Sequence, residues 1–178
     1  MYKLLRSKTI FKHKRLTLIE DRVVLPNKEE TDYLKFEYPG EAAVAVIAKR
    51  RDGKILLHKE YFYPADKKLF TFPGGMVEKG EGIKRGARRE LLEEAQLRPR
   101  KLKALGSYYF NDRRSDIKLF VYLATELRED ASHKEEPEEE GTQAFWLSEK
   151  EIEALMKTRL FNNHSLAAWL LYKIKETR

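Results

Sequence analysis

The sequence predicts an α/β (α+β) sandwich of strands and helices, with a small antiparallel β unit in front of it. Short strand-like runs fill most of the chain before residue 72, a helix-forming segment begins near Gly82, and two more helical patterns follow Ser148. The chain has 178 residues, 42% of them hydrophobic, which fits one domain with a small appendage. We therefore expect an N-terminal strand unit in residues 1–40 and the main domain in residues 41–178.

The N-terminal unit is expected to contain three antiparallel strands. Runs rich in β-branched and aromatic residues indicate them at Thr9–Phe11, Leu16–Ile19 and Tyr33–Tyr38. Proline and asparagine within Leu25–Lys28 predict a turn between the second and third strands, and the Pro39-Gly40 pair ends the unit.

The main domain begins with a continuous apolar run, Ala42–Ala48, which is typical of a buried central strand. A hairpin turn at residues 51–54 leads into a returning strand at Ile55–Tyr63. After a loop at Pro64–Lys68, the run Leu69–Phe72 leads into a glycine-rich break.

The second half of the main domain predicts three more strands and two helices. The strands are expected at Leu102–Tyr109, Ile117–Thr125 and Thr142–Leu147, separated by a polar loop at 110–116 and an acidic loop at 128–141. Ser148 is expected to cap a helix that runs to about Lys157. A final helix starts at Asn162 or Asn163, and we expect its buried face to contain Leu166, Trp169, Leu170 and Ile174.

Composition narrows the classes of function. The formal net charge is +7 and the pI about 9.4, so the surface should attract phosphates on nucleotides or nucleic acid. No nucleic-acid motif accompanies this charge, which favours small anionic substrates. The absence of cysteine excludes thiol catalysis. No apolar run is long enough to span a membrane and no signal peptide is evident, so we expect a cytoplasmic protein.

Three glutamates after the glycine-rich break form an acidic cluster. Glu90, Glu93 and Glu94 are spaced i, i+3 and i+4, so all three lie on one face of the expected helix, where like charges repel. A divalent cation would neutralise them, and ligands that are all oxygens suit Mg²⁺ or Mn²⁺. The alternative is a solvated face whose glutamates pair with neighbouring arginines.

The spacing around these glutamates resembles the Nudix box. That pattern is a glycine, five residues, a glutamate, seven residues, and then Arg-Glu-aliphatic-any-Glu-Glu-any-Gly-aliphatic. The matching positions here are Gly75, Glu81, Arg89-Glu90-Leu91, Glu93-Glu94 and Leu97. Gln96 is the one departure, because it stands where the family has the glycine that serves as a left-handed helix cap.

The resemblance implies a Nudix fold, in which a mixed β-sheet lies between helices. It also implies a metal-dependent hydrolase of diphosphate linkages. It implies Mg²⁺ or Mn²⁺ held by Glu90, Glu93, Glu94 and the carbonyl of Gly74. Arg89 would orient Glu93 through an i, i+4 pair. Glu81 would orient these ligands without binding the metal itself, or it would cap the start of the helix.

Further segments resemble the ADP-ribose pyrophosphatase branch of the family, whose members hydrolyse ADP-ribose and other nucleoside diphosphate sugars. They are the approach Leu69–Gly75, the run Ser165–Ala168 and the triplet Glu138-Glu139-Glu140. The branch places a water-activating glutamate in that loop, so Glu138 is the expected general base and Glu140 an additional metal ligand; the alternative is a solvated acidic loop. The chain departs from the branch at Thr71, at Glu60-Tyr61-Phe62 and at Asn111-Asp112.

The expected substrate contacts are Phe62, Arg113 and Arg114. The histidines His58 and His164 are interpreted as structural, because neither has a second ligand at metal spacing. The resemblance also implies a homodimer with a small nucleotide substrate. Alternative substrates are dinucleotide polyphosphates, nucleoside triphosphates and RNA 5′ ends, and the remaining alternative is a module that binds nucleotide or nucleic acid without hydrolysis.

Overall fold

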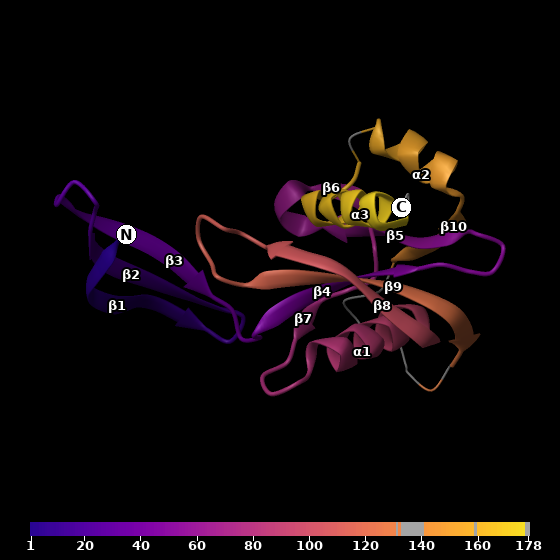
Figure 1. Ribbon diagram of the computed structural model, residues 1–178, viewed down its shortest axis with the longest axis horizontal. Helices are drawn as coiled ribbons and strands as arrows, with labels where there is room; N and C mark the ends of the chain where they lie inside the picture. Colours follow the sequence, from indigo (N-terminus) through magenta and orange to yellow (C-terminus); the bar gives the residue numbers. More distant parts are fainter. Residues whose placement is uncertain (131, 133–140, 159, 177–178) are drawn as a thin grey trace.

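The computed structural model describes residues 1–130, 132, 141–158 and 160–176. An N-terminal sheet projects to one side, and two further sheets lie in the main body between one helix below and two helices above (Figure 1). This mixed arrangement confirms the predicted fold class, including the antiparallel unit in front. The boundary at residue 40 stays a prediction.

The N-terminal sheet has the order β1-β2-β3 and is antiparallel throughout. Its strands are β1 (Lys3–His13), β2 (Leu16–Val24) and β3 (Glu30–Glu37). Every residue of β1 is exposed, whereas alternate residues of β2 are buried. One of these is Asp21, which accepts a hydrogen bond from Ser7 at 2.6 Å and pairs with Lys35 at 2.9 Å.

The central sheet is built around a strand that is buried along its whole length, as the apolar run predicts. Its order is β7-β4-β9-β8, with β4 and β9 parallel and the other pairs antiparallel. The strands are β4 (Ala42–Ala48), β7 (Met76–Val77), β8 (Leu97–Tyr109) and β9 (Lys118–Glu129). Successive residues of β4 point to opposite faces, so Ala45 and Ile47 join one hydrophobic core and Val44 and Val46 join the other.

Strand β8 begins earlier than the sequence predicts, at Leu97 rather than Leu102. Pro99 lies within this added stretch and argues against a strand when only the local sequence is considered. Because β8 is at the edge of the sheet, a residue without a backbone N–H is tolerated there.

The second sheet has the order β10-β5-β6 and is antiparallel. Its strands are β5 (Ile55–Phe62), β6 (Lys67–Thr71) and β10 (Gln143–Leu147), and the short 3-10 helix η1 (Tyr63–Ala65) joins the first two. The turn of residues 51–54 connects β4 of the central sheet to β5, where the backbone N–H of Arg50 donates to the carbonyl of Lys54 at 2.9 Å.

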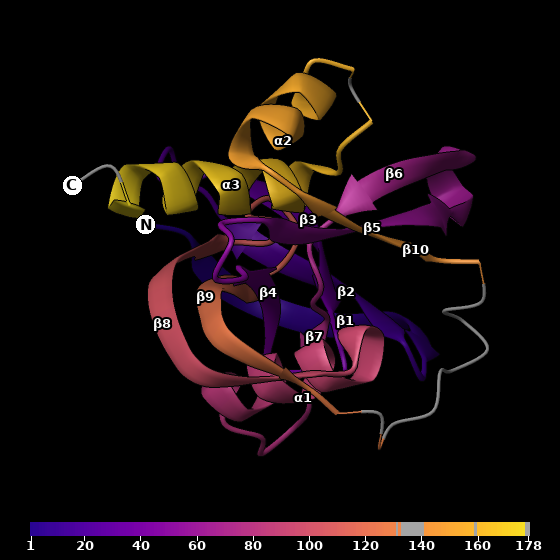
Figure 2. The same ribbon diagram turned by 90° about the vertical axis from the view of Figure 1, so that its right-hand side faces the viewer.

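The helices cover opposite sides of these sheets (Figures 1 and 2). They are α1 (Ile83–Ala95), α2 (Glu149–Met156) and α3 (Asn163–Glu176). Ser148 caps α2 through a complete capping box, because its side chain accepts from the N–H of Glu151 and its own N–H donates to the Glu151 side chain. In the described part of the chain, no helix is both long and apolar enough to cross a membrane.

The buried face of α3 differs from the expected one. Trp169 is buried as predicted, but Leu166, Leu170 and Ile174 are 43%, 60% and 48% exposed. Ser165, Ala168 and Tyr172 are buried instead. Small residues at two of these positions let the helix approach the sheets closely, and Ser165 accepts a hydrogen bond from the backbone of Phe72 at 3.0 Å. That polar contact rotates the buried face away from the one that hydrophobicity alone favours.

Candidate active site

The glycine-rich loop runs alongside β4 and faces α1. The N–H groups of Val44 and Val46 donate to the carbonyls of Gly75 and Pro73, at 2.9 and 2.8 Å. A Cβ atom on Gly74 would lie 2.1 Å from the carbonyl oxygen of Val44, and one on Gly75 would lie 2.7 Å from both carboxylate oxygens of Glu90. Gly74 therefore has to be glycine, because a side chain would clash with the backbone of β4. At Gly75 a side chain would displace the Glu90 carboxylate.

The loop and α1 are joined through Glu94. The N–H of Gly74 donates to Glu94 Oε2 at 3.1 Å. This contact places Gly74, whose carbonyl is the expected oxygen donor from the loop, beside the acidic cluster.

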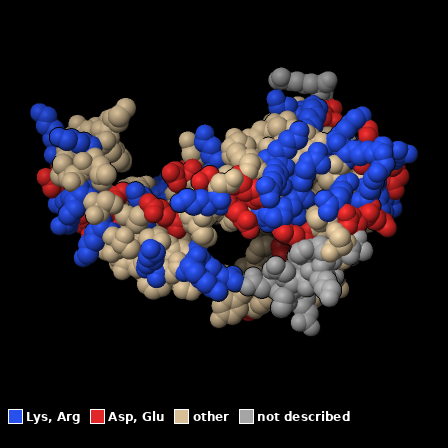
Figure 3. All heavy atoms as spheres, turned by 90° about the horizontal axis from the view of Figure 1, so that it is seen from below, with Lys and Arg blue, Asp and Glu red and all other residues tan. Residues whose placement is uncertain are grey.

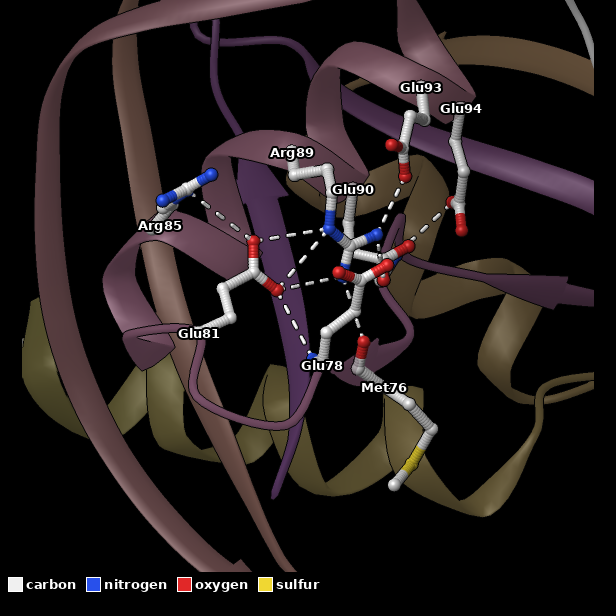
Figure 4. Close-up of polar contacts among 9 residues, drawn as sticks. Met76, Glu78, Glu81, Arg85, Arg89, Glu90, Glu93 and Glu94 are labelled. Atoms are coloured by element: carbon white, nitrogen blue, oxygen red, sulfur yellow. Dashed lines mark hydrogen bonds and ion pairs between the residues drawn. The ribbon is translucent and has the colours of Figure 1, made fainter. Parts of the chain in front are cut away.

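Arg89 occupies the middle of the cluster (Figure 4). Its guanidinium donates to Glu93 at 2.7 Å, to Glu81 at 3.1–3.3 Å and to the carbonyl of Met76 at 2.9 Å. It also lies 2.9 Å from Glu90. One planar cation therefore fixes carboxylates from both ends of the box relative to the loop.

Glu81 holds Arg89 rather than capping the helix. Its side chain is only 7% exposed and also accepts from the N–H of Glu78 at 3.2 Å. The helix N-cap is Gly82, with no side-chain hydrogen bond. The expected alternative of a helix cap at Glu81 is therefore wrong. Hydrogen bonds from Arg89 lower the pKa of Glu81, so it is ionised at neutral pH.

Glu90 is the most buried of the three clustered glutamates, with 8% of its surface exposed. Its pKa is raised to about 7, chiefly by burial. Arg89 lowers this pKa, while the neighbouring Glu94 and Glu93 contribute to the rise. A bound cation would stabilise this buried carboxylate more than an exposed one, because burial makes an unneutralised charge unfavourable.

The chemistry of the donor set fits a hard divalent cation. The donors on one face of α1 are carboxylate oxygens, and the adjoining loop supplies the expected backbone carbonyl of Gly74. Within the described residues, however, no group of three acidic or histidine side chains is gathered at metal-binding distance. Glu93 instead contacts the Arg89 guanidinium at 2.7 Å. The expected loop residues Glu138 and Glu140 lie outside the described part of the chain.

The structure separates the expected substrate contacts. Phe62 lines a cavity of about 220 Å³ beside Gly74 and Gly75. Arg113 and Arg114 line a different cavity, of about 410 Å³, between β3 and the 110–116 loop. Arg114 donates from its side chain to the carbonyl of Leu34 at 3.1 Å, which docks the loop on the N-terminal sheet. Their roles in substrate binding stay predictions.

His58 was missed as a neighbour of the cluster. It is 3% exposed, and its Nδ1 lies 3.7 Å from Glu94 Oε2. The two residues lie 36 positions apart, and no local pattern links β5 to α1. Only the folded structure, which brings His58 of β5 beside Glu94 of α1, reveals their proximity.

Basic side chains gather on the face of the main body that carries α1 (Figure 3). Such a face raises the local concentration of anions. It therefore suits phosphate-bearing ligands better than apolar molecules.

Residues 39–170 match the NUDIX domain family. The chain belongs to the Nudix family. Nudix relatives include an ADP-ribose pyrophosphatase of Bacillus subtilis (strain 168), 30% identical over 157 residues, which are 88% of this chain and 84% of the relative. A methanol dehydrogenase activator of Bacillus methanolicus is 28% identical over 176 residues, 98% of this chain and 94% of the relative.

Two further matches agree with this membership. An ADP-ribose pyrophosphatase of Methanocaldococcus jannaschii is 36% identical over 90 residues, 51% of this chain and 52% of the relative. A solved structure described as an ADP compounds hydrolase superposes with a TM-score of 0.86 at 20% identity, covering 97% of this chain and 92% of that one, which shows the shared fold. This Nudix chain is therefore a pyrophosphohydrolase that resembles the ADP-ribose pyrophosphatase branch.

Proposed function

We propose that the chain is a divalent-metal-dependent hydrolase of nucleoside diphosphate derivatives, with ADP-ribose as the leading substrate. The products would be a nucleoside monophosphate and a sugar phosphate. The observation that carries the proposal is the position of Glu90, Glu93 and Glu94 on one face of α1, opposite the loop of Gly74. The named activity of the B. subtilis relative supports the choice of substrate.

In this mechanism the three glutamates and the carbonyl of Gly74 would hold Mg²⁺ or Mn²⁺, with Glu140 as an additional ligand. When bound, the metal supplies charge neutralisation on the diphosphate and lowers the pKa of a coordinated water. Arg89 keeps Glu93 in position by the 2.7 Å contact, and Glu81 keeps Arg89 in position. Glu138 is the proposed general base for the attacking water.

Turnover of a substrate panel tests the proposal. The panel contains ADP-ribose, NADH, GDP-mannose, UDP-glucose, diadenosine polyphosphates and nucleoside triphosphates, each with Mg²⁺ or Mn²⁺ and with phosphatase to reveal monophosphate products. We expect metal-dependent hydrolysis with a preference for ADP-ribose. Activity on polyphosphates or triphosphates alone would contradict the proposed substrate but leave the proposed metal site intact. A separate assay on 5′-triphosphate RNA would test hydrolysis of RNA ends.

A homodimer is part of the proposal, with the N-terminal sheet contributing to the contact. The exposed apolar side chains of β1 support it, since Leu4, Leu5, Ile10 and Phe11 are each at least 45% exposed. Light scattering at micromolar concentration should give twice the mass of the 21.0 kDa chain. A monomer would remove this part of the proposal.

The activator from B. methanolicus supports a second candidate function, because it matches nearly the whole chain. In that case the chain would change the turnover of a dehydrogenase. Adding the chain with Mg²⁺ to a purified dehydrogenase, and comparing it with a Glu94→Gln variant, would show whether such an effect exists and whether it needs the acidic cluster.

A further inference from the structure

The cavity beside Gly74 and Gly75 has an apolar and aromatic wall. It is about 220 Å³ in volume and lies where β4, β5, β9 and the start of α3 meet. Its larger apolar and ring side chains are Phe62, Phe72, Met76, Phe110, Leu119 and His164. No lysine or arginine is among its described lining residues, and Glu60 contributes an acidic group. A phosphate is therefore disfavoured inside this cavity, although it adjoins the loop opposite the acidic cluster.

Most of the polar groups in the wall already bond to one another. Asn162 donates from Nδ2 to Thr71 Oγ1 at 3.0 Å and accepts at Oδ1 from the N–H of Ser165 at 2.7 Å. Ser165 Oγ accepts from the N–H of Phe72 at 3.0 Å and lies 3.3 Å from Thr71 Oγ1. These groups have little hydrogen-bonding capacity left for the hydroxyls of a sugar.

His164 adds a flat, polar-edged ring to this wall. Its imidazole stacks on Phe110 with 4.1 Å between ring centroids and 14° between planes. Tyr108 holds the backbone of His164 by donating to its carbonyl at 2.8 Å. Burial lowers the pKa of His164, which favours the neutral ring with one donor and one acceptor nitrogen.

We propose that this cavity takes the nucleobase of the substrate and that His164 is a residue that determines base specificity. The inference rests on the proposed function, in which the diphosphate lies at the acidic cluster. The lack of lysine and arginine among the described lining residues disfavours the phosphates in the cavity, and the internal hydrogen bonds disfavour a sugar. The rings of Phe62, Phe110 and His164 favour a planar heterocycle.

A titration without turnover tests the cavity directly. Two-dimensional NMR spectra of the labelled full chain would be recorded with AMP or with ribose 5-phosphate, which carries a phosphate but no base. We expect AMP to shift resonances of Phe62, Phe110 and His164, and ribose 5-phosphate to leave them unchanged. Equal shifts with both ligands, or AMP shifts confined to other parts of the protein, would overturn the proposal.

Kinetics of two variants test the role of His164. His164→Ala should raise the KM for ADP-ribose about tenfold, with kcat changed less than twofold, because base stacking is lost. His164→Phe keeps a ring and should recover part of this loss while relaxing the preference between bases. His13→Ala is the control, because His13 is exposed and stacks on Phe11 outside the cavity.

The two proposals fail in different ways. If the wild-type chain hydrolyses no member of the panel, the proposed function fails, and the AMP titration still decides whether the cavity binds a base. If the wild type hydrolyses ADP-ribose and His164→Ala has an unchanged KM and base preference, only the base cavity is overturned. Should His164→Ala not fold, His164→Phe and the titration decide.

Discussion

At the scale of single residues, Arg89 couples the two ends of the box. Its hydrogen bonds reach Glu81 before α1 and Glu93 one turn further along the helix. Because the Glu81 side chain is 7% exposed, its charge depends on this partner rather than on water. The same guanidinium thus stabilises the fold and positions a proposed metal ligand.

Replacing Arg89 by alanine should therefore reduce both stability and activity. Leaving the buried Glu81 carboxylate unpaired should cost about 3 kcal/mol of unfolding free energy, measured by urea denaturation. Arg85→Ala is the matched control, since Arg85 is 84% exposed and lies 4.0 Å from the same carboxylate. It should cost less than about 1 kcal/mol. Equal losses in the two variants would contradict the coupling role of Arg89.

The raised pKa of Glu90 predicts that the stability of the metal-free protein depends on pH. Its pKa is raised to about 7 in the folded chain from an ordinary value of 4.5, so the native state binds more protons between these values. Its contribution to stability is therefore full below pH 4.5 and is lost as pH rises through about 7. Denaturation of chelator-treated protein at several pH values should show this loss, and Glu90→Gln should remove it. A Glu90→Gln profile identical to that of the wild type would refute the assignment.

At the scale of elements, α1 ends at the box departure. Gln96 adopts φ 53° and ψ 40°, the left-handed conformation that favours glycine, and its N–H donates to the carbonyls of Leu91 and Leu92. The geometry expected of the family glycine is therefore kept by a residue that carries a Cβ atom. The cost is local strain at the helix end rather than a displaced acidic cluster.

Gln96→Gly should stabilise the protein by about 1 kcal/mol, because glycine adopts this conformation without strain. Thermal unfolding should show a rise of about 2–4 °C in Tm. Gln96→Ala retains the Cβ atom and should give no such gain. A fall in Tm with glycine would show that the Gln96 side chain makes a compensating contact.

The elements also show what local sequence can predict. Continuous apolar residues predicted buried β4, and the box predicted α1 with its three glutamates on one face. The prediction of the buried face of α3 was wrong, because Ser165 contacts Phe72, which lies 93 residues away in the sequence. The position of Arg114 could not be predicted from local sequence either, because it depends on the contact between its loop and Leu34. Both features depend on contacts between segments that are distant in the sequence, and the periodicity of hydrophobic residues does not predict such contacts.

At the scale of the whole molecule, the N-terminal sheet stands apart from both hydrophobic cores. All buried residues of the two cores lie at or after residue 42, and the sheet reaches the main body through contacts such as Tyr33 Oη to the carbonyl of Arg113, 2.8 Å. The division at residue 40 stays a prediction, and the distribution of the core suggests how to test it.

A chain of residues 39–178 should consequently fold on its own. Circular dichroism and thermal unfolding should show one cooperative transition, because neither core loses a buried side chain. The matched comparison is the full chain under the same conditions. A fragment without cooperative unfolding would show that the N-terminal sheet is part of the folding unit.

The central claim is that the clustered glutamates hold a catalytic metal, and Glu94→Gln tests it most directly. The substitution keeps the side-chain shape and the acceptor for the N–H of Gly74 but removes the charge. With Mg²⁺ and ADP-ribose, we predict a fall in kcat of about a thousandfold and weaker Mn²⁺ binding, with Tm nearly unchanged. Glu153→Gln, on the exposed side of α2, should behave as wild type. Turnover by Glu94→Gln at the wild-type rate would contradict the metal site.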